Sequence, residues 1–112
     1  MPIANCLISP RVAEKIDAAE TIVDLWSDYS GQSKEHMTLN LISSLAQAGA
    51  QFDAMAFLYL PSLWSEEAVS KLQIGLAKSL SEYFSVPLES VQVVTYIVNS
   101  GRVIEDGKQV EW

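Results

Sequence analysis

The chain carries the same pattern twice: an apolar run, an amphipathic helix and a second apolar run. The two copies are offset by about 54 residues, which is what an internal duplication would give. Each copy is typical of a βαβ unit with a right-handed crossover. We therefore expect one α+β (α/β) domain over residues 1–112, with pseudo-repeats 2–53 and 54–112. Its two βαβ units would form a four-stranded mixed sheet with both helices on one face.

In the first copy, the apolar run 3–8 predicts a strand that stops at Ser9 and Pro10. Serine is a good N-cap and proline fits the first helical position, so we expect a helix to begin there. Gly31 is placed to end that helix. A second strand over 37–42 and a loop of small and polar residues over 43–53 follow. The predicted apolar helix face consists of Val12, Ile16, Ala19, Ile22, Val23 and Trp26.

In the second copy, residues 54–60 and 91–98 are predicted strands on either side of a helix that Ser65 caps. Pro87 separates that helix from the second strand. Asp106-Gly107, between two short apolar segments, predicts a tight C-terminal hairpin. The predicted apolar face of the helix consists of Val69, Leu72, Leu76, Leu80, Tyr83 and Phe84.

Both faces of the predicted sheet are apolar. A monomer with helices on one face should expose a polar surface on the other. Strands 54–60 and 91–98 carry apolar side chains at odd and at even positions alike. We therefore expect the uncovered face to pack against other copies of the chain in a homo-oligomer.

The charge balance excludes several classes of partner. With 7 cationic and 14 acidic side chains the net charge is −7, which argues against binding nucleic acid or an anionic membrane face. No apolar run approaches the roughly 18 residues that a membrane span needs. The first residues lack the features of a secretory signal, and a single cysteine, Cys6, fits a reducing compartment. We expect a cytoplasmic location.

Four short motifs carry a family resemblance. They are the opening Met1–Ala4 (MPIA), the helix end Tyr29–Gly31 (YSG), the segment Val86–Val94 (VPLESVQVV) and Gly101 in the tail. With the duplicated pattern, they make nearly the whole chain resemble the tautomerase superfamily. The opening and the Val86–Val94 segment are similar to 4-oxalocrotonate tautomerase, and the double length to macrophage migration inhibitory factor (MIF). The resemblance implies a homotrimer whose sheets form a central barrel.

The resemblance also implies a cofactor-independent keto–enol tautomerase, an isomerase, with Pro2 as general base. Removal of Met1 would leave Pro2 with a free secondary amine. Burial in an apolar pocket disfavours the ammonium form, so that a neutral amine is present near neutral pH. Such an amine can take a proton from the carbon next to a carbonyl group and return it elsewhere. The expected substrate is a small 2-oxo acid, either aromatic or dicarboxylic.

The chain departs from the family where substrate carboxylates are usually bound. Gln92 stands where 4-oxalocrotonate tautomerase has a strand arginine and MIF a tyrosine, and Gln32 replaces a lysine. Pro61 has no N–H to donate where the family has a backbone donor. The remaining candidates for orienting an anionic substrate are Arg11, Lys34 and Arg102, and each of them is alternatively a solvated surface charge. Residues that could wall the pocket are Tyr59, Trp64, Tyr96 and Val103, for which core packing is the alternative.

Two other readings stay open. Within the same fold, Pro2 could act as an acid in a hydratase, dehalogenase or decarboxylase, which would need two arginines, such as Arg11 and Arg102, on the substrate carboxylate. Alternatively, the protein is a catalytically silent binding module. His36 has no partner at metal-ligand spacing and is interpreted as a surface residue. No metal and no cofactor are expected.

Overall fold

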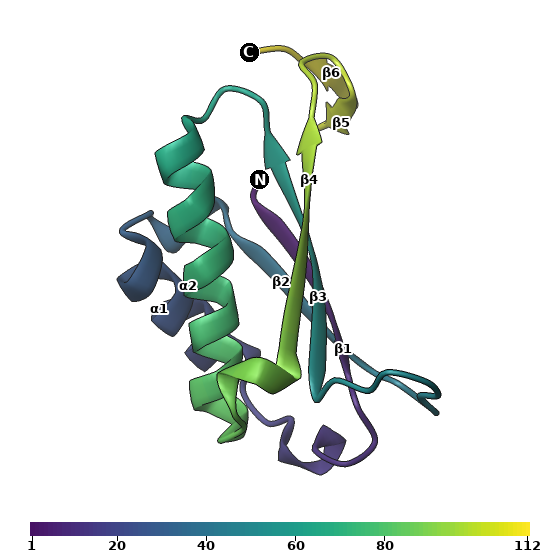
Figure 1. The fold of residues 1–112 in the computed structure, drawn as a ribbon. Coiled ribbons are helices and arrows are strands. Elements are labelled where there is room, and N and C mark those ends of the chain that lie inside the picture. Colours follow the sequence, from purple (N-terminus) through teal and green to yellow (C-terminus); the bar gives the residue numbers. More distant parts are fainter.

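A computed structural model of the chain describes residues 1–112, and it contains two layers. A four-stranded sheet forms one layer and two helices cover one of its faces (Figure 1). A two-stranded hairpin follows the sheet at the C-terminus. The elements are β1 (Ile3–Ile8), α1 (Ala19–Ser30), β2 (Thr38–Ser43), β3 (Ala54–Pro61), α2 (Glu66–Phe84), β4 (Val91–Val98), β5 (Val103–Glu105) and β6 (Lys108–Val110).

The sheet has the strand order β2-β1-β3-β4. β1 and β2 are parallel, as are β3 and β4, and the central pair β1–β3 is antiparallel. Each parallel pair is joined through one helix, as a βαβ unit requires. The predicted mixed sheet with two helices on one face is therefore confirmed.

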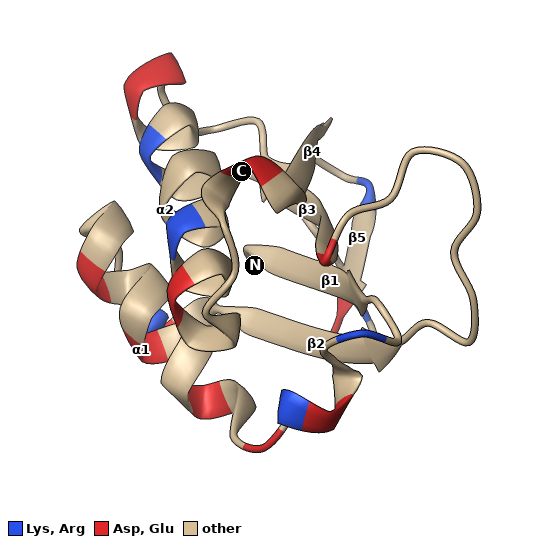
Figure 2. Cartoon of the chain, turned by 60° about the horizontal axis from the view of Figure 1, so that its bottom comes forward, with Lys and Arg blue, Asp and Glu red and all other residues tan.

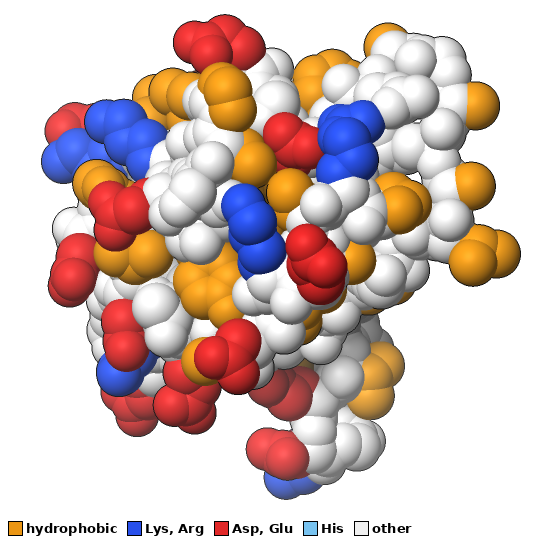
Figure 3. Space-filling view, turned by 90° about the horizontal axis from the view of Figure 1, so that it is seen from below, with side chains coloured by type: hydrophobic (Ala, Val, Ile, Leu, Met, Phe, Trp, Pro, Cys, Tyr) orange, Lys and Arg blue, Asp and Glu red, His pale blue; other side chains and the backbone are white.

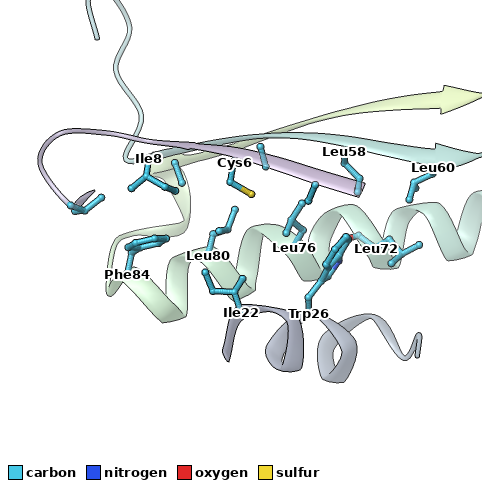
Figure 4. Close-up of a cluster of buried hydrophobic side chains, with 14 residues drawn as sticks. Cys6, Ile8, Ile22, Trp26, Leu58, Leu60, Leu72, Leu76, Leu80 and Phe84 are labelled. Atoms are coloured by element: carbon cyan, nitrogen blue, oxygen red, sulfur yellow. The ribbon is translucent and has the colours of Figure 1, made fainter. Parts of the chain in front are cut away.

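The core lies between the sheet and the helices and contains 14 buried apolar residues (Figure 4). Alternate residues of β1, such as Cys6 and Ile8, point toward the helices. There they share the core with Leu76 and Leu80 of α2 and Trp26 of α1. Buried side chains therefore recur every two residues in the strands and about every 3.6 residues in the helices, which are the spacings used to predict these elements from the sequence.

Trp26 is the largest of the fully buried side chains. Its indole Nε1–H donates to the carbonyl oxygen of Leu72 at 2.9 Å, so the one polar atom of the side chain has a partner. The bond links α1 directly to α2.

Cys6 is buried in β1, and desolvation raises the pKa of its thiol from 9.0 to about 12. The thiolate is the reactive form. At pH 8 we therefore expect alkylation of native Cys6 to be roughly a thousandfold slower than in the denatured chain, from the three-unit difference in pKa alone. Because the native thiol holds its proton up to the higher pKa, this group stabilises the fold below pH 9, and that contribution is lost as pH rises toward 12. Iodoacetamide labelling followed by mass spectrometry measures the ratio of rates; equal rates would contradict the burial of Cys6.

The predicted start of the first helix at Pro10 is wrong. The Ser9 Oγ accepts a hydrogen bond from Arg11 N, and the Ser9 carbonyl accepts from Val12 N and Ala13 N, so the chain turns there. A 3-10 turn follows over Ala13–Lys15, and α1 begins only at Ala19, with no side-chain cap. Val12 and Ile16, assigned to the helix face, lie in this preceding segment and still pack on the core.

The segment before α1 is held by the end of α2. The Tyr83 hydroxyl accepts from Asp17 N at 2.9 Å and from Ala18 N at 3.0 Å, and donates to the carbonyl of Lys15. Lys15 Nζ in turn donates to the carbonyl of Phe84. These bonds satisfy backbone groups that a helix starting at Pro10 would have paired within itself.

We expect Tyr83→Phe to lower the free energy of unfolding by about 1 kcal/mol, because two backbone N–H groups lose their acceptor at a position that water can reach. Hydrogen exchange at the amides of Asp17 and Ala18 should accelerate. Tyr29→Phe is the matched control, since the Tyr29 hydroxyl also links the helices but makes a single hydrogen bond, to the Glu82 side chain, and serves no backbone group. Equal effects of the two substitutions on urea unfolding would contradict this role of Tyr83.

The other predicted boundaries agree closely with the structure. Gly31 ends α1 with φ +75°, a left-handed conformation that suits glycine. The Ser65 Oγ accepts from Ala68 N and caps α2. Asp106 and Gly107 both have positive φ and join β5 to β6, which confirms the predicted hairpin. No helix has both the length and the apolarity to cross a membrane.

The second face of the sheet is uncovered and largely apolar. It presents Phe57 and Tyr59 of β3 and Val94 and Tyr96 of β4, and the four strands contain no charged residue. The acidic and basic residues lie mainly on the helices and connections (Figure 2). We call this surface, made by the side chains opposite the helices, the open face.

Candidate active site

Pro2 is buried at the beginning of β1. Its carbonyl accepts a hydrogen bond from Thr38 N at 3.0 Å, which ties it to the start of β2. On the other side of β1, Ile3 lies opposite Tyr59, near the end of β3. The sheet therefore fixes Pro2 from both sides, at the end of the molecule where the C-terminal hairpin also lies (Figure 1). With Met1 in place, the Pro2 nitrogen is part of an amide; it becomes an amine when Met1 is removed.

Two clefts meet at the N-terminus. The first, of about 310 Å³, lies between the start of β1, the 3-10 turn Lys34–His36 and β5. The second, of about 220 Å³, lies between the end of β3 and the hairpin. Met1, Val103 and Glu105 line both. Because Met1 lines both clefts, its removal would open them toward each other beside Pro2, which itself lines neither cleft while Met1 is in place.

The side chains around these clefts are apolar and acidic. Ile3, Met37 and Ile104 form apolar walls of the first cleft. Its ionisable side chains are Glu35, Glu105 and His36, and neither cleft is lined by a lysine or an arginine.

The second cleft is closed on one side by Trp112. Its indole Nε1–H donates to the Ser62 Oγ at 2.9 Å, and its backbone N–H donates to the Ser100 Oγ at 2.8 Å. These two bonds fasten the C-terminus beside the end of β3.

Three of the predicted pocket residues lie near Pro2. Val103 lines both clefts. Tyr59, the register partner of Ile3, and Tyr96 stack on the open face with ring centroids 5.3 Å apart. Trp64 instead packs against the core and lines neither cleft.

Arg11 and Gln92 lie at the opposite end of the sheet. β1 separates Arg11 from Pro2, and its six residues span roughly 20 Å. Arg11 donates to Asp53, with Nη2 3.0 Å from Oδ1, and to Gln51. On the face seen from below in Figure 3, the basic side chains lie dispersed among acidic and apolar ones. Within one chain neither Arg11 nor Gln92 reaches the clefts.

The other two predicted cations lie at the Pro2 end. Lys34 is in the turn before β2, but its Nζ is 2.6 Å from Asp24 Oδ1, and that hydrogen bond raises the pKa of Lys34. Its side chain lines a neighbouring hollow with Glu20 and Asp24. Arg102 follows Gly101 directly before β5, and its exposed side chain makes no hydrogen bond or ion pair within the chain.

Sequence reasoning missed Glu35, Glu105 and Trp112 as cleft residues and treated His36 as a surface residue. His36 is exposed and also lines the first cleft. The position of Glu105 next to the predicted hairpin turn was the one sequence feature that set it apart. The sequence does not indicate toward which part of the molecule the hairpin folds, so this feature did not place Glu105 in a cleft. No three His, Cys, Asp or Glu side chains are grouped as a metal ion would require.

The arrangement of two βαβ units joined by an antiparallel β1–β3 pair is shared by solved structures of the kind that the sequence motifs resemble. This confirms the resemblance carried by the sequence motifs. The chain is similar to the crystal structure of Pt0534 inactivated by 2-oxo-3-pentynoate, with TM-score 0.76 and 17% identity over 97% of this chain and 96% of that one. It is also similar to the F6 fused 4-OT asymmetric trimer, with TM-score 0.78 and 13% identity over 96% of this chain and 95% of that one.

The likeness extends to the macrophage migration inhibitory factor of Trichinella spiralis, with TM-score 0.70 and 12% identity over 96% of this chain and 99% of that one. No protein-family model matches the sequence, and no curated protein sequence matches it. At these low identities the likeness to solved structures establishes the fold.

Proposed function

We propose that the protein is a cofactor-independent keto–enol tautomerase in which Pro2, freed by removal of Met1, is the general base. The observation that carries the proposal is the position of Pro2: it is buried just before β1, between Met1, which lines both clefts, and Ile3, which lines the first, in a fold like that of solved tautomerase-superfamily structures. The substrate is a small 2-oxo compound, and the resemblance suggests a 2-oxo acid.

In the proposed reaction the neutral amine of Pro2 takes a proton from the carbon next to the carbonyl group. The C–H electron pair moves to form the enolate, and the proton returns to the enolate oxygen or to another carbon. Apolar walls such as Ile3 and Val103 keep water away from the amine and disfavour its charged form.

For an acid substrate, Arg102 is the proposed partner of the carboxylate, because its side chain is free and it directly precedes β5. Lys34 is the second candidate at this end. Arg11 and Gln92 would take part only from a neighbouring copy of the chain. We propose Tyr59 and Tyr96 as walls of the assembled site, and Trp64 as a support of the adjoining core.

The alternative reaction, with Pro2 as an acid, is favoured by one observation. Glu35 and Glu105 lie around the N-terminus, and carboxylates stabilise a nearby ammonium group. A protonated Pro2 would donate its proton in a hydration, dehalogenation or decarboxylation.

Mass spectrometry and an enolisation assay test the proposal. We expect the natively produced chain to lack Met1 and to enolise phenylpyruvate or its methyl ester faster than the uncatalysed reaction. Retention of Met1, or no acceleration with either compound, would contradict the catalytic role of Pro2 and leave a silent binding protein.

We also propose that the chain forms a homotrimer through the open face and acts in the cytoplasm. The support is that Val94 and Tyr96 are exposed there among uncharged strands, at 36% and 47%, and that the similar fused 4-OT structure is a trimer. Burying an apolar face of this kind between copies of the chain lowers the free energy and so stabilises the oligomer.

Replacing Val94 with lysine should dissociate the oligomer, because the ammonium group would be buried in the interface. Ile74→Lys is the matched control, since Ile74 is also an exposed apolar residue but lies on α2, away from the open face. Size-exclusion chromatography with light scattering gives the mass of each. A monomeric wild-type chain, or equal behaviour of the two variants, would contradict the interface.

A further inference from the structure

The peptide bond between Met1 and Pro2 is held inside the fold. Pro2 is buried, and its carbonyl accepts a hydrogen bond from Thr38 N at 3.0 Å. The next residue, Ile3, pairs with Thr38 of β2 on one side and with Tyr59 of β3 on the other. Whether a terminal bond can be cleaved depends on the burial and the hydrogen bonding of its backbone. Here both oppose cleavage.

Met1 itself lies against the part of the chain that is synthesised last. It is half-buried and lines both clefts. Trp112 is fastened beside it by hydrogen bonds to Ser62 and Ser100. The cover over Met1 is therefore complete only when the C-terminal segment has folded back onto the end of β3. The residues of that segment that line the clefts with Met1 are Val103, Ile104, Glu105, Val110 and Trp112.

An aminopeptidase that removes Met1 has to bind the terminal residues in an extended form and reach the Met1 carbonyl carbon. In the folded chain this requires release of Met1 from the hairpin and of Pro2 from β2. Neighbouring copies packed on the open face would cover this end further and leave these contacts in place. During synthesis the bond is uncovered, because the hairpin is added roughly 5–20 s after Met1 at ordinary rates of translation.

We propose that Met1 is removed only during synthesis, and that the folded chain is closed to methionine aminopeptidases. The hydrolysis adds water across the Met1–Pro2 amide and yields free methionine and the secondary amine of Pro2. If Pro2 is the general base, which is the proposed function on which this inference rests, each chain becomes active or silent before it has folded. Competition between Met1 removal and folding, and not later processing, then sets the active fraction.

A purified methionine aminopeptidase tests the proposal on the folded chain. The chain is released from an N-terminal fusion so that it begins with Met1, and loss of methionine is followed by mass spectrometry. The matched control carries Gly-Ser-Gly-Ser between Pro2 and Ile3, which places the same terminal dipeptide outside the fold. We expect the native chain to lose Met1 at least about tenfold more slowly than the control, because cleavage follows the small population with an open terminus. Equal rates would overturn the proposal.

A pair of variants tests whether the hairpin closes the bond. Trp112→Ala loosens the hairpin beside Met1, whereas Tyr83→Phe has an expected cost in stability of similar size at the end of α2, away from the N-terminus (Figure 1). We expect Trp112→Ala to raise the rate of Met1 removal several-fold and Tyr83→Phe to leave it near that of the wild type. Equal effects would mean that Met1 is released by opening of the whole domain, and would overturn the role of the hairpin.

The outcomes keep the inference apart from the proposed function. Ready removal of Met1 from the folded chain would overturn the inference and leave the tautomerase proposal standing. Slow removal, with the same rate of enolisation for chains with and without Met1, would support closure of the bond and contradict the catalytic role of Pro2.

Discussion

A chain that retains Met1 is expected to enolise its substrate about 10²–10⁴-fold more slowly than the same chain beginning at Pro2, which is the usual contribution of a general base. The physical reason is that an amide nitrogen has no lone pair available for a proton. Comparison of the processed and unprocessed forms changes only the terminal residue and leaves the sheet intact. The measurement is kcat/KM for phenylpyruvate and its methyl ester, with the N-terminus of each form verified by mass spectrometry.

The dependence of the rate on pH distinguishes a base from an acid at Pro2. If the neutral amine is the active form, kcat/KM falls as pH drops through the pKa of the amine. If the ammonium form is active, kcat/KM falls as pH rises through it. Equal rates for the processed and unprocessed forms would exclude both roles. Pro2→Ala, which keeps an amine but loses the ring, provides an intermediate control.

Trp26→Ala is expected to lower the free energy of unfolding by about 3–5 kcal/mol. The indole is fully buried between the sheet and the helices, and its removal leaves a cavity. The carbonyl of Leu72 also loses the 2.9 Å hydrogen bond from Nε1. Since small domains are stable by only about 5–15 kcal/mol, this single change removes a large part of the total.

The matched control is Trp112→Ala, which removes the same side chain from a position that is 37% exposed. We expect a loss of about 1 kcal/mol, mainly from its hydrogen bond to Ser62. Urea unfolding, followed by circular dichroism at one protomer concentration, compares the two variants. Losses of similar size would contradict the placement of Trp26 in the core.

The strands and the second helix were predictable because their signals are local. Alternation in β3 separates buried Ala56 and Leu58 from Phe57 and Tyr59 on the open face. The Ser65 side chain caps α2 by accepting a hydrogen bond from the N–H of Ala68, only three residues further along the chain. The hairpin turn needs only two adjacent residues that tolerate positive φ.

The candidate site was predictable only in part. Val103 was singled out and lines a cleft with Met1 and Ile3, the chain neighbours of Pro2. Arg11 and Gln92 were grouped with Pro2 by family resemblance and lie at the far end of the chain's own sheet. Glu105 went unnoticed because nothing near it in the sequence indicates that it faces the N-terminus. Positions more than a hundred residues apart become neighbours only through the path of the whole chain.

The sequence by itself determined the order of the strands and helices, the apolar face of each and the apolar character of both sides of the sheet, because these follow from the period of side chains along the backbone. Only the tertiary structure decided where α1 begins and which charges surround Pro2. The first depends on Tyr83, 66 residues away from Asp17, and the second on how the C-terminal hairpin and the turn before β2 converge on the N-terminus. Both features depend on contacts between segments that are distant in the sequence. Such contacts form only when the whole chain has folded, and they produce no periodic pattern of residues from which they could be predicted.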